Sequence, residues 1–89
     1  MVAKVVKDIT PVLSQMAKDI SSFPKDVVIK SAQLTIDDLG IYRISVDYEF
    51  DSAEFNITER VYGDLSGAVN SVLGHIKEFY DTVHEFKKG

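Results

Sequence analysis

The segment from Ile41 to Phe50 alternates between apolar and polar residues. Its even-numbered positions are apolar and its odd-numbered positions from 43 to 49 are polar: Tyr42, Ile44, Val46, Tyr48 and Phe50 against Arg43, Ser45, Asp47 and Glu49. Successive side chains of a β-strand point to opposite faces of its sheet. The pattern therefore predicts a strand with one buried face and one face in water.

A second strand is predicted from Val27 to Ile36, and Asp37-Asp38-Leu39-Gly40 forms the turn that follows it. If residues 38–40 form the loop, Gly40 takes the left-handed conformation that such loops commonly need. This register sets apolar residues opposite one another in four pairs: Ile36 with Tyr42, Leu34 with Ile44, Ala32 with Val46, and Val28 with Phe50. A loop longer by one residue would turn polar side chains toward the core.

A third strand is predicted from Glu54 to Tyr62, where the apolar residues stand at odd positions. A tight connection at Ser52-Ala53 would bring these residues opposite the apolar side of the preceding strand. The expected pairs are Phe50 with Phe55, Tyr48 with Ile57, and Ile44 with Val61. The three strands then share one apolar face.

Two segments show helical spacing of apolar residues, from Val2 to Phe23 and from Asp64 to Lys88. Thr10-Pro11 interrupts the first, since Thr is a good N-cap and Pro a good first helical residue. Either the helix starts at Pro11 after a separate short segment, or one long helix bends there. The apolar spacing continues through the proline without a break, which favours a single bent helix.

These elements predict an α+β fold, with the 89 residues forming one domain over 1–89. The expected order is helix, three-stranded antiparallel meander in the order 1-2-3, helix. Both apolar helical stripes need the single apolar sheet face, so we expect a two-layer sandwich with both helices on one side.

Charge is concentrated in the middle of the chain. The net charge is −4, yet residues 37–64 hold eight acidic and only two basic residues. Binding DNA or RNA normally requires a cluster of Lys and Arg, so we expect no nucleic-acid partner. Double-stranded-RNA-binding domains share this order of elements, but they have lysines at the start of the second helix, where this chain reads GDLSGAVNS.

Other function classes are disfavoured by what the sequence lacks. It contains no cysteine, which excludes disulfides, thiolate metal sites and cysteine nucleophiles. No apolar run reaches membrane-spanning length. A signal peptide needs an uninterrupted apolar segment, whereas Lys4, Lys7 and Asp8 interrupt the valines at the N-terminus. We therefore expect a cytoplasmic protein without a membrane partner.

The outer face of the sheet is the main candidate surface for binding. Stacking the predicted registers puts arginines at one end of this face and acids at the other. The residues assigned to protein binding are Arg43, Asp47, Glu49, Asp51 and Glu54. Because the acids predominate, the expected partner is a protein with a basic surface.

Two charged residues, Lys30 and Glu59, fall on the buried face in the predicted register. We expect their stems to cover apolar neighbours while their charges reach water at the rim. An enzyme or small-ligand binder would instead use a pocket between helices and sheet, with Glu59, Tyr48 and His84 as the nearest polar groups.

No spacing in the sequence indicates a metal, cofactor or catalytic group. His75 and His84 lie nine residues apart, on nearly opposite sides of a helix, so they cannot share a metal. His75 with Glu78 would supply only half of a site. We therefore predict no enzyme activity and no cofactor.

Gly67, Ser71 and Gly74 form a stripe of small residues opposite the apolar stripe of the last helix. Gly inside a helix costs about 1 kcal/mol relative to Ala, so two of them call for a reason. Close approach of a second copy would supply one, and the stripe is a candidate for self-association as a homodimer.

The function that we predict is a small acidic, non-enzymatic interaction module, such as an inhibitor or modulator of the kind that phages and viruses encode. The alternatives are a homo-oligomeric structural or assembly protein, and a small-ligand binder or enzyme.

Overall fold

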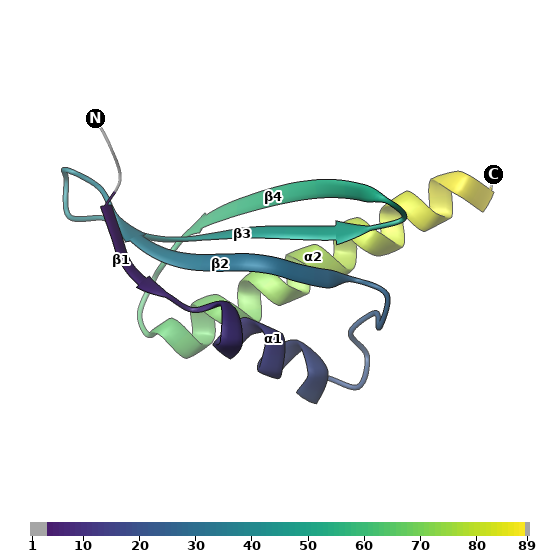
Figure 1. The fold of residues 1–89 in the computed structure, drawn as a ribbon, viewed down its shortest axis with the longest axis horizontal. Helices are drawn as coiled ribbons and strands as arrows, with labels where there is room; N and C mark the ends of the chain where they lie inside the picture. Colours follow the sequence, from purple (N-terminus) through teal and green to yellow (C-terminus); the bar gives the residue numbers. More distant parts are fainter. Residues whose placement is uncertain (1–3, 89) are drawn as a thin grey trace.

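The computed structural model describes residues 4–88, which form two helices and a four-stranded antiparallel sheet (Figure 1). The elements are β1 (Lys4–Asp8), α1 (Thr10–Asp19), β2 (Val28–Ile36), β3 (Tyr42–Phe50), β4 (Ala53–Arg60) and α2 (Leu65–Lys88). The α+β class is confirmed. Residues 1–3 and 89 of the predicted domain lie outside the described part of the chain.

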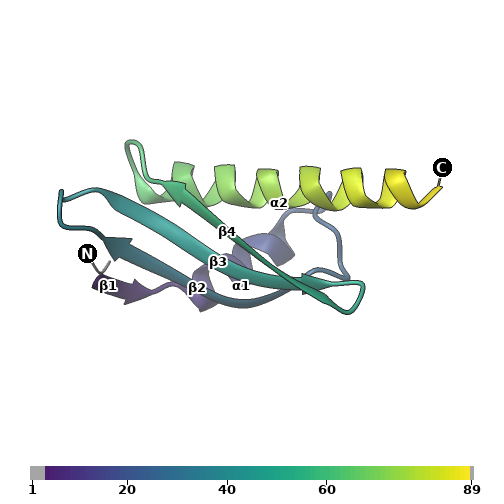
Figure 2. The same cartoon turned by 90° about the horizontal axis from the view of Figure 1, so that it is seen from above.

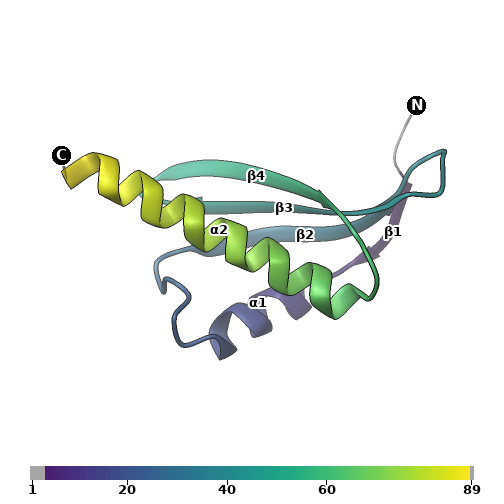
Figure 3. The ribbon, with the colours of Figure 1, turned by 180° about the vertical axis from the view of Figure 1, so that it is seen from behind.

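The strands are arranged in chain order, β1-β2-β3-β4, and both helices lie on the same side of the sheet (Figures 1 and 3). α1 packs beneath β2, whereas α2 runs along the β4 side of the molecule (Figure 2). The opposite face of the sheet has no helix over it. The predicted two-layer arrangement with one open face is therefore present.

The prediction of three strands and one long bent helix at the N-terminus is wrong. Residues 4–8 form β1, which pairs antiparallel with the end of β2, and α1 begins only at Thr10. Val5 and Val6 are each 50% exposed, so they do not continue the buried stripe of α1. β-branched residues favour a strand, and β1 covers an edge of β2 that would otherwise be bare. Val2, where the helix was expected to begin, lies outside the described residues.

The core lies between the sheet and the two helices and is formed by fully buried apolar side chains. Its largest members come from β3, α2 and the α1 region: Phe50, Ile9, Leu13, Ile44, Leu73, Ile76, Val46, Val69 and Val72. The predicted inner face of β3 is confirmed from Ile44 to Phe50. Tyr42, the first residue of β3, is 45% exposed.

The turn between β2 and β3 forms as predicted, with Gly40 at a φ of +77° and Ile36 opposite Tyr42. Leu34 opposite Ile44 and Ala32 opposite Val46 are also confirmed. The pairing of Val28 with Phe50 is wrong, because a β-bulge between Ile29 and Ser31 shifts the register.

The bulge also corrects the placement of Lys30. The extra residue takes Lys30 out of the ladder, so this lysine is exposed and Ile29 faces Tyr48 instead. Val28 then pairs with Glu49 and is 51% exposed. The bulge thus places the apolar Ile29, and not the charged Lys30, opposite Tyr48.

The register predicted between β3 and β4 is wrong by two residues. The turn is formed by Asp51 and Ser52, both with positive φ (+53° and +63°), and not by Ser52-Ala53. Such two-residue turns match the twist of the strands they connect. The shift brings Phe50 opposite Ala53, Tyr48 opposite Phe55, and Ile44 opposite Glu59. A shift of two residues preserves the faces, so the odd-numbered residues of β4 still point toward α2.

Candidate functional site

The candidate surface is the open face of the sheet, the side away from both helices in Figure 1. Its rows follow from the observed registers: Thr35, Arg43 and Arg60; Gln33, Ser45 and Thr58; Ser31, Asp47 and Asn56; Val28, Glu49 and Glu54. Four of the five residues predicted to bind a protein lie on this face, namely Arg43, Asp47, Glu49 and Glu54. The fifth, Asp51, is in the turn and points elsewhere.

Like charges face each other at both ends of this surface. Glu49 lies directly opposite Glu54 across β3 and β4, and Arg43 lies directly opposite Arg60. Directly opposed like charges in an antiparallel pair reduce stability, by roughly 0.2–1 kcal/mol per pair. The open face therefore contains two unfavourable pairs of opposite sign, at its two ends.

The arginine pair has partial compensation nearby. The Arg43 guanidinium lies 3.5 Å from a carboxylate oxygen of Asp37, and the Arg60 guanidinium lies 5.0 Å from the centre of the Tyr62 ring. In contrast, neither Glu49 nor Glu54 has a cationic side chain within 4.0 Å among the residues that the structure describes. The repulsion at the acidic end is thus less compensated by nearby groups than the repulsion at the arginine end.

Between the two ends, Asp47 is held by hydrogen bonds across the sheet. Its carboxylate accepts from Ser31 Oγ at 3.1 Å and from Asn56 Nδ2 at 2.7 Å. These three residues form one row over β2, β3 and β4. Asp47 is thereby fixed in orientation, while each carboxylate oxygen keeps a further lone pair for an external donor.

Asp47 and Glu54 line a shallow hollow of about 450 Å³ on this face. Its polar lining is completed by Ser31, Asn56 and the bulge residue Lys30. The bulge thus shapes the acidic end of the surface. A lysine or arginine side chain of a partner fits this chemistry, since it would meet two carboxylates and several hydrogen-bond acceptors.

A second polar group lies between β4 and α2. Glu59 is on the inner face of β4 as predicted and is only partly exposed. Its carboxylate oxygens are both 2.7 Å from His75 Nδ1, and Ser71 Oγ donates to Oε1 at 3.4 Å. The contact partner of His75 is therefore Glu59 and not Glu78, the residue that helical spacing suggested.

The stripe of Gly67, Ser71 and Gly74 lies along the exposed side of α2. Gly67 and Ser71 border a groove of about 440 Å³ together with Glu59, His75 and Tyr62. Gly67 has a local reason to lack a side chain, because a Cβ there would lie 3.0 Å from Asp64 Oδ1, which accepts the Gly67 N–H at 2.7 Å and caps the helix. Gly74 has open space around it.

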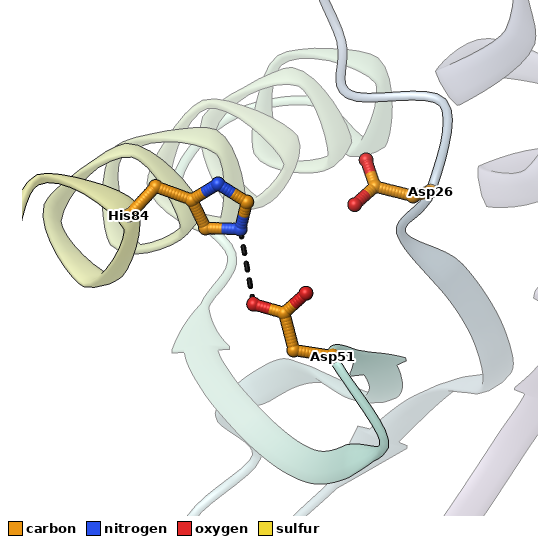
Figure 4. A group of neighbouring side chains, drawn as sticks. All are labelled: Asp26, Asp51 and His84. Carbon is orange, nitrogen blue, oxygen red and sulfur yellow. Dashed lines mark hydrogen bonds and ion pairs between the residues drawn. The ribbon is translucent and has the colours of Figure 1, made fainter. Parts of the chain in front are cut away.

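A third polar group gathers around Asp51, at the end of the molecule where α2 extends past the β3–β4 turn (Figures 3 and 4). Asp51 Oδ2 accepts from His84 Nε2 at 3.0 Å and from Lys87 Nζ at 2.9 Å. The Lys87 ammonium, and with it His84, holds the pKa of the Asp51 carboxyl below its usual value despite partial desolvation. Asp51 thus fastens the turn to the helix.

Asp26, from the segment between α1 and β2, lies beside this turn (Figure 4). Its carboxylate accepts a hydrogen bond from the Tyr80 hydroxyl, with Oδ1 and Oδ2 at 2.7 Å and 2.9 Å from the phenol oxygen. That hydrogen bond raises the pKa of Tyr80 to about 12. The Tyr80 ring in turn stacks on His84, with centroids 4.1 Å apart.

The polar residues of the small-ligand interpretation are not brought together. Glu59 pairs with His75, whereas His84 pairs with Asp51 about 13 Å farther along the helix axis. Tyr48 is buried between Phe50 and Phe55, and burial raises the pKa of its phenol. The geometry therefore offers no single pocket containing all three.

Sequence reasoning gave Asp26, Tyr80 and Lys87 no role in a site. Asp26 and Tyr80 are 54 residues apart, and no local spacing connects them.

Comparisons with family models, with curated proteins and with solved structures found no match. Neither helix, as far as the structure describes them, has the length and apolar content needed to cross a bilayer.

Proposed function

We propose that this chain is a non-enzymatic interaction module that binds a basic protein surface through the acidic end of its open sheet face. The observation that supports this most directly is the Glu49–Glu54 pair. Two carboxylates face each other there with no cationic side chain within 4.0 Å among residues 4–87, and a lysine or arginine from a partner would relieve their repulsion. Asp47, fixed by Ser31 and Asn56, provides a third acceptor beside them.

The proposal makes stability and binding respond in opposite directions. Replacing Glu54 by Lys turns an unfavourable pair with Glu49 into a favourable one, so the free protein should become more stable by about 0.5–1 kcal/mol. The same change places a positive charge where the partner's basic group would bind, so capture of the partner should be lost. A residue with only a structural role would not show this opposition.

The experiment compares three baits in affinity purification from the native host: the parent chain, Glu54→Lys, and Glu85→Lys. Glu85 is exposed on α2 and does not belong to the open sheet face. Its replacement by Lys changes the net charge by the same amount as Glu54→Lys and is therefore a matched control. We expect a basic partner to be retained by the parent and by Glu85→Lys and lost by Glu54→Lys. Added salt should weaken the complex. A partner retained by Glu54→Lys would contradict the proposal, as would the absence of any basic partner.

A second candidate function, self-association, is favoured by the outer edge of β4, which pairs with no other strand among residues 4–88. The two-residue turn makes Phe50 and Ala53 a hydrogen-bonded pair, so the even-numbered residues of β4 direct their N–H and C=O groups outward. β4 has neither Pro nor a bulge to protect this edge, whereas β1 at the other edge is short, bulged and contains Lys4 and Lys7.

Pairing of two copies about Ile57 would be complementary in charge. In an antiparallel two-fold arrangement, Glu54 of each copy stands opposite Arg60 of the other, and Asn56 stands opposite Thr58. Glu54 and Arg60 would each then gain an opposite charge on the outer side of β4, beside the like charge that each faces on β3. A homodimer built in this way would extend the sheet across the β4 edges.

A further inference from the structure

The cluster at the β3–β4 turn has the composition of a metal site. Asp26, Asp51 and His84 come from three separate segments, and one ligand atom from each lies within 4.8 Å of those of the other two (Figure 4). The donors are one imidazole nitrogen and two carboxylate oxygens. This set suits Zn²⁺, which binds three protein ligands of these types and leaves a fourth position for water.

We propose that Asp26, Asp51 and His84 bind a divalent transition metal, with Zn²⁺ as the ion that fits best. Zinc ligands stand at about 2.0–2.2 Å from the metal and hence roughly 3.4 Å from each other. The three donor atoms need to close in by no more than about 1.5 Å to reach that spacing. All three side chains lie at the surface on a helix, a turn and a connecting loop, where rotation of the side chains supplies this movement.

One neighbouring residue, Tyr80, already contacts two of the ligands. The Tyr80 hydroxyl donates a hydrogen bond to Asp26, and the Tyr80 ring stacks on the imidazole of His84. Hydrogen bonds to ligating carboxylates and support for the ligating histidine are usual around metal sites, and their loss typically lowers affinity by 10–100-fold. Tyr80 therefore serves as a positioning residue for both Asp26 and His84.

Lys87 occupies the position of a competing cation. Its ammonium lies 2.9 Å from Asp51 Oδ2, the same oxygen that contacts His84. The lysine side chain is 60% exposed and flexible, so it can withdraw into water when a metal arrives. A divalent ion would bring two positive charges to two carboxylates, where Lys87 brings one.

The other histidine provides a matched control. His75 also pairs with a carboxylate, Glu59, at 2.7 Å, on the same helix, and its side chain is more exposed than that of His84 (52% against 36%). No third ligand joins this pair among the residues that the structure describes. If zinc bound to any exposed histidine–carboxylate pair, both histidines would contribute to binding. At the proposed site, His84 contributes and His75 does not.

The test is calorimetric titration of the full chain with ZnCl₂ at neutral pH, after removal of bound metals with a chelator. We expect one zinc ion per chain, with affinity reduced at least tenfold by His84→Ala and by Asp26→Asn and reduced by about tenfold or more by Tyr80→Phe. His75→Ala should change the affinity by less than about twofold, and Lys87→Met should tighten binding because the competing cation is gone.

A second measurement guards against loss of folding. Zinc should raise the melting temperature of the parent, of His75→Ala and of Lys87→Met, since the ion joins three segments of the folded state only. His84→Ala should melt cooperatively and show no such rise. The proposal is overturned if zinc gives no heat with the parent, if His84→Ala binds as tightly, or if His75→Ala loses as much affinity as His84→Ala.

Discussion

Asp8 and Thr10 form the short link that turns the chain from β1 into α1. The Asp8 carboxylate accepts the Thr10 backbone N–H at 2.9 Å, and the Thr10 hydroxyl accepts the Ala32 N–H of β2 at 2.9 Å. These bonds satisfy polar groups at the start of the helix and fasten it to the sheet. They replace the helical hydrogen bonds that a continuous N-terminal helix would have made.

Asp8 should make stability depend on pH. Its hydrogen bonds from the side chain and the backbone of Thr10 hold its pKa below the usual 3.8. A carboxyl whose pKa is lower in the folded state stabilises the fold above the unfolded pKa, and this contribution is lost as the pH falls through the folded pKa. Asp8→Asn should therefore be less stable than the parent at about pH 6, with the difference shrinking toward about pH 2.

Urea titrations at several pH values measure that difference. Asp38→Asn is the control, because Asp38 is an exposed carboxylate in the β2–β3 loop without a side-chain hydrogen bond among the described residues. A stability difference for Asp8→Asn that stays constant down to the lowest pH would count against this role.

At the scale of the elements, the turn between β3 and β4 decides the register of a whole strand. Asp51 and Ser52 both adopt left-handed backbone conformations, which are natural for Gly, tolerated by Asp and unfavourable for Ser. The strand pairing, the position of Glu54 opposite Glu49 and the approach of Asp51 to α2 all depend on this turn. The chain accepts local strain at Ser52 in return for these contacts.

Ser52→Gly should relieve that strain. Since Gly adopts positive φ at no steric cost, we expect the variant to be more stable by about 0.5–1 kcal/mol in urea denaturation. Ser66→Gly, at a helical position in the first turns of α2, should instead destabilise by a similar amount. A Ser52→Gly variant that is less stable than the parent would show that Ser52 does not have a positive φ in the folded protein.

For the whole molecule, the two edges of the sheet differ in how they are protected. β1 is short, irregular and basic, whereas β4 presents eight residues without a break. α2 lies on the β4 side (Figure 2), so a chain added at this edge would meet the groove that Ser71 and His75 border. The β4 edge is thus the natural place for a second copy to join the sheet.

Charge exchange tests the homodimer at this edge. In the two-fold arrangement, Glu54→Arg puts arginine opposite Arg60 twice per dimer, which should raise the dissociation constant by about threefold or more. Adding Arg60→Glu should restore association, because each arginine again faces a glutamate. Sedimentation equilibrium over a range of concentrations measures both variants. A parent chain that is monomeric at every concentration excludes this arrangement.

Much of the architecture was predictable from alternation alone. The inner face of β3, the turn at Gly40 and the covering of one sheet face by both helices follow from burying apolar side chains at intervals of two and of three to four residues. The segment of residues 4–8 was not predictable in this way, because two adjacent valines between lysines fit either interval. Its pairing with β2 decided the outcome.

The positions of the charged residues were likewise only partly predictable from the sequence. The sequence by itself determined that Asp47, Glu49 and Glu54 share the solvent side of the sheet, because side chains in a strand alternate between its faces and a two-residue shift preserves them. Only the tertiary structure decided which charges face each other and that Asp26, Asp51 and His84 meet. Those relations depend on a bulge, a turn and the packing of a helix against segments that are distant in sequence. Interactions between distant segments do not produce a periodic pattern of apolar and polar residues, so the sequence pattern does not predict them.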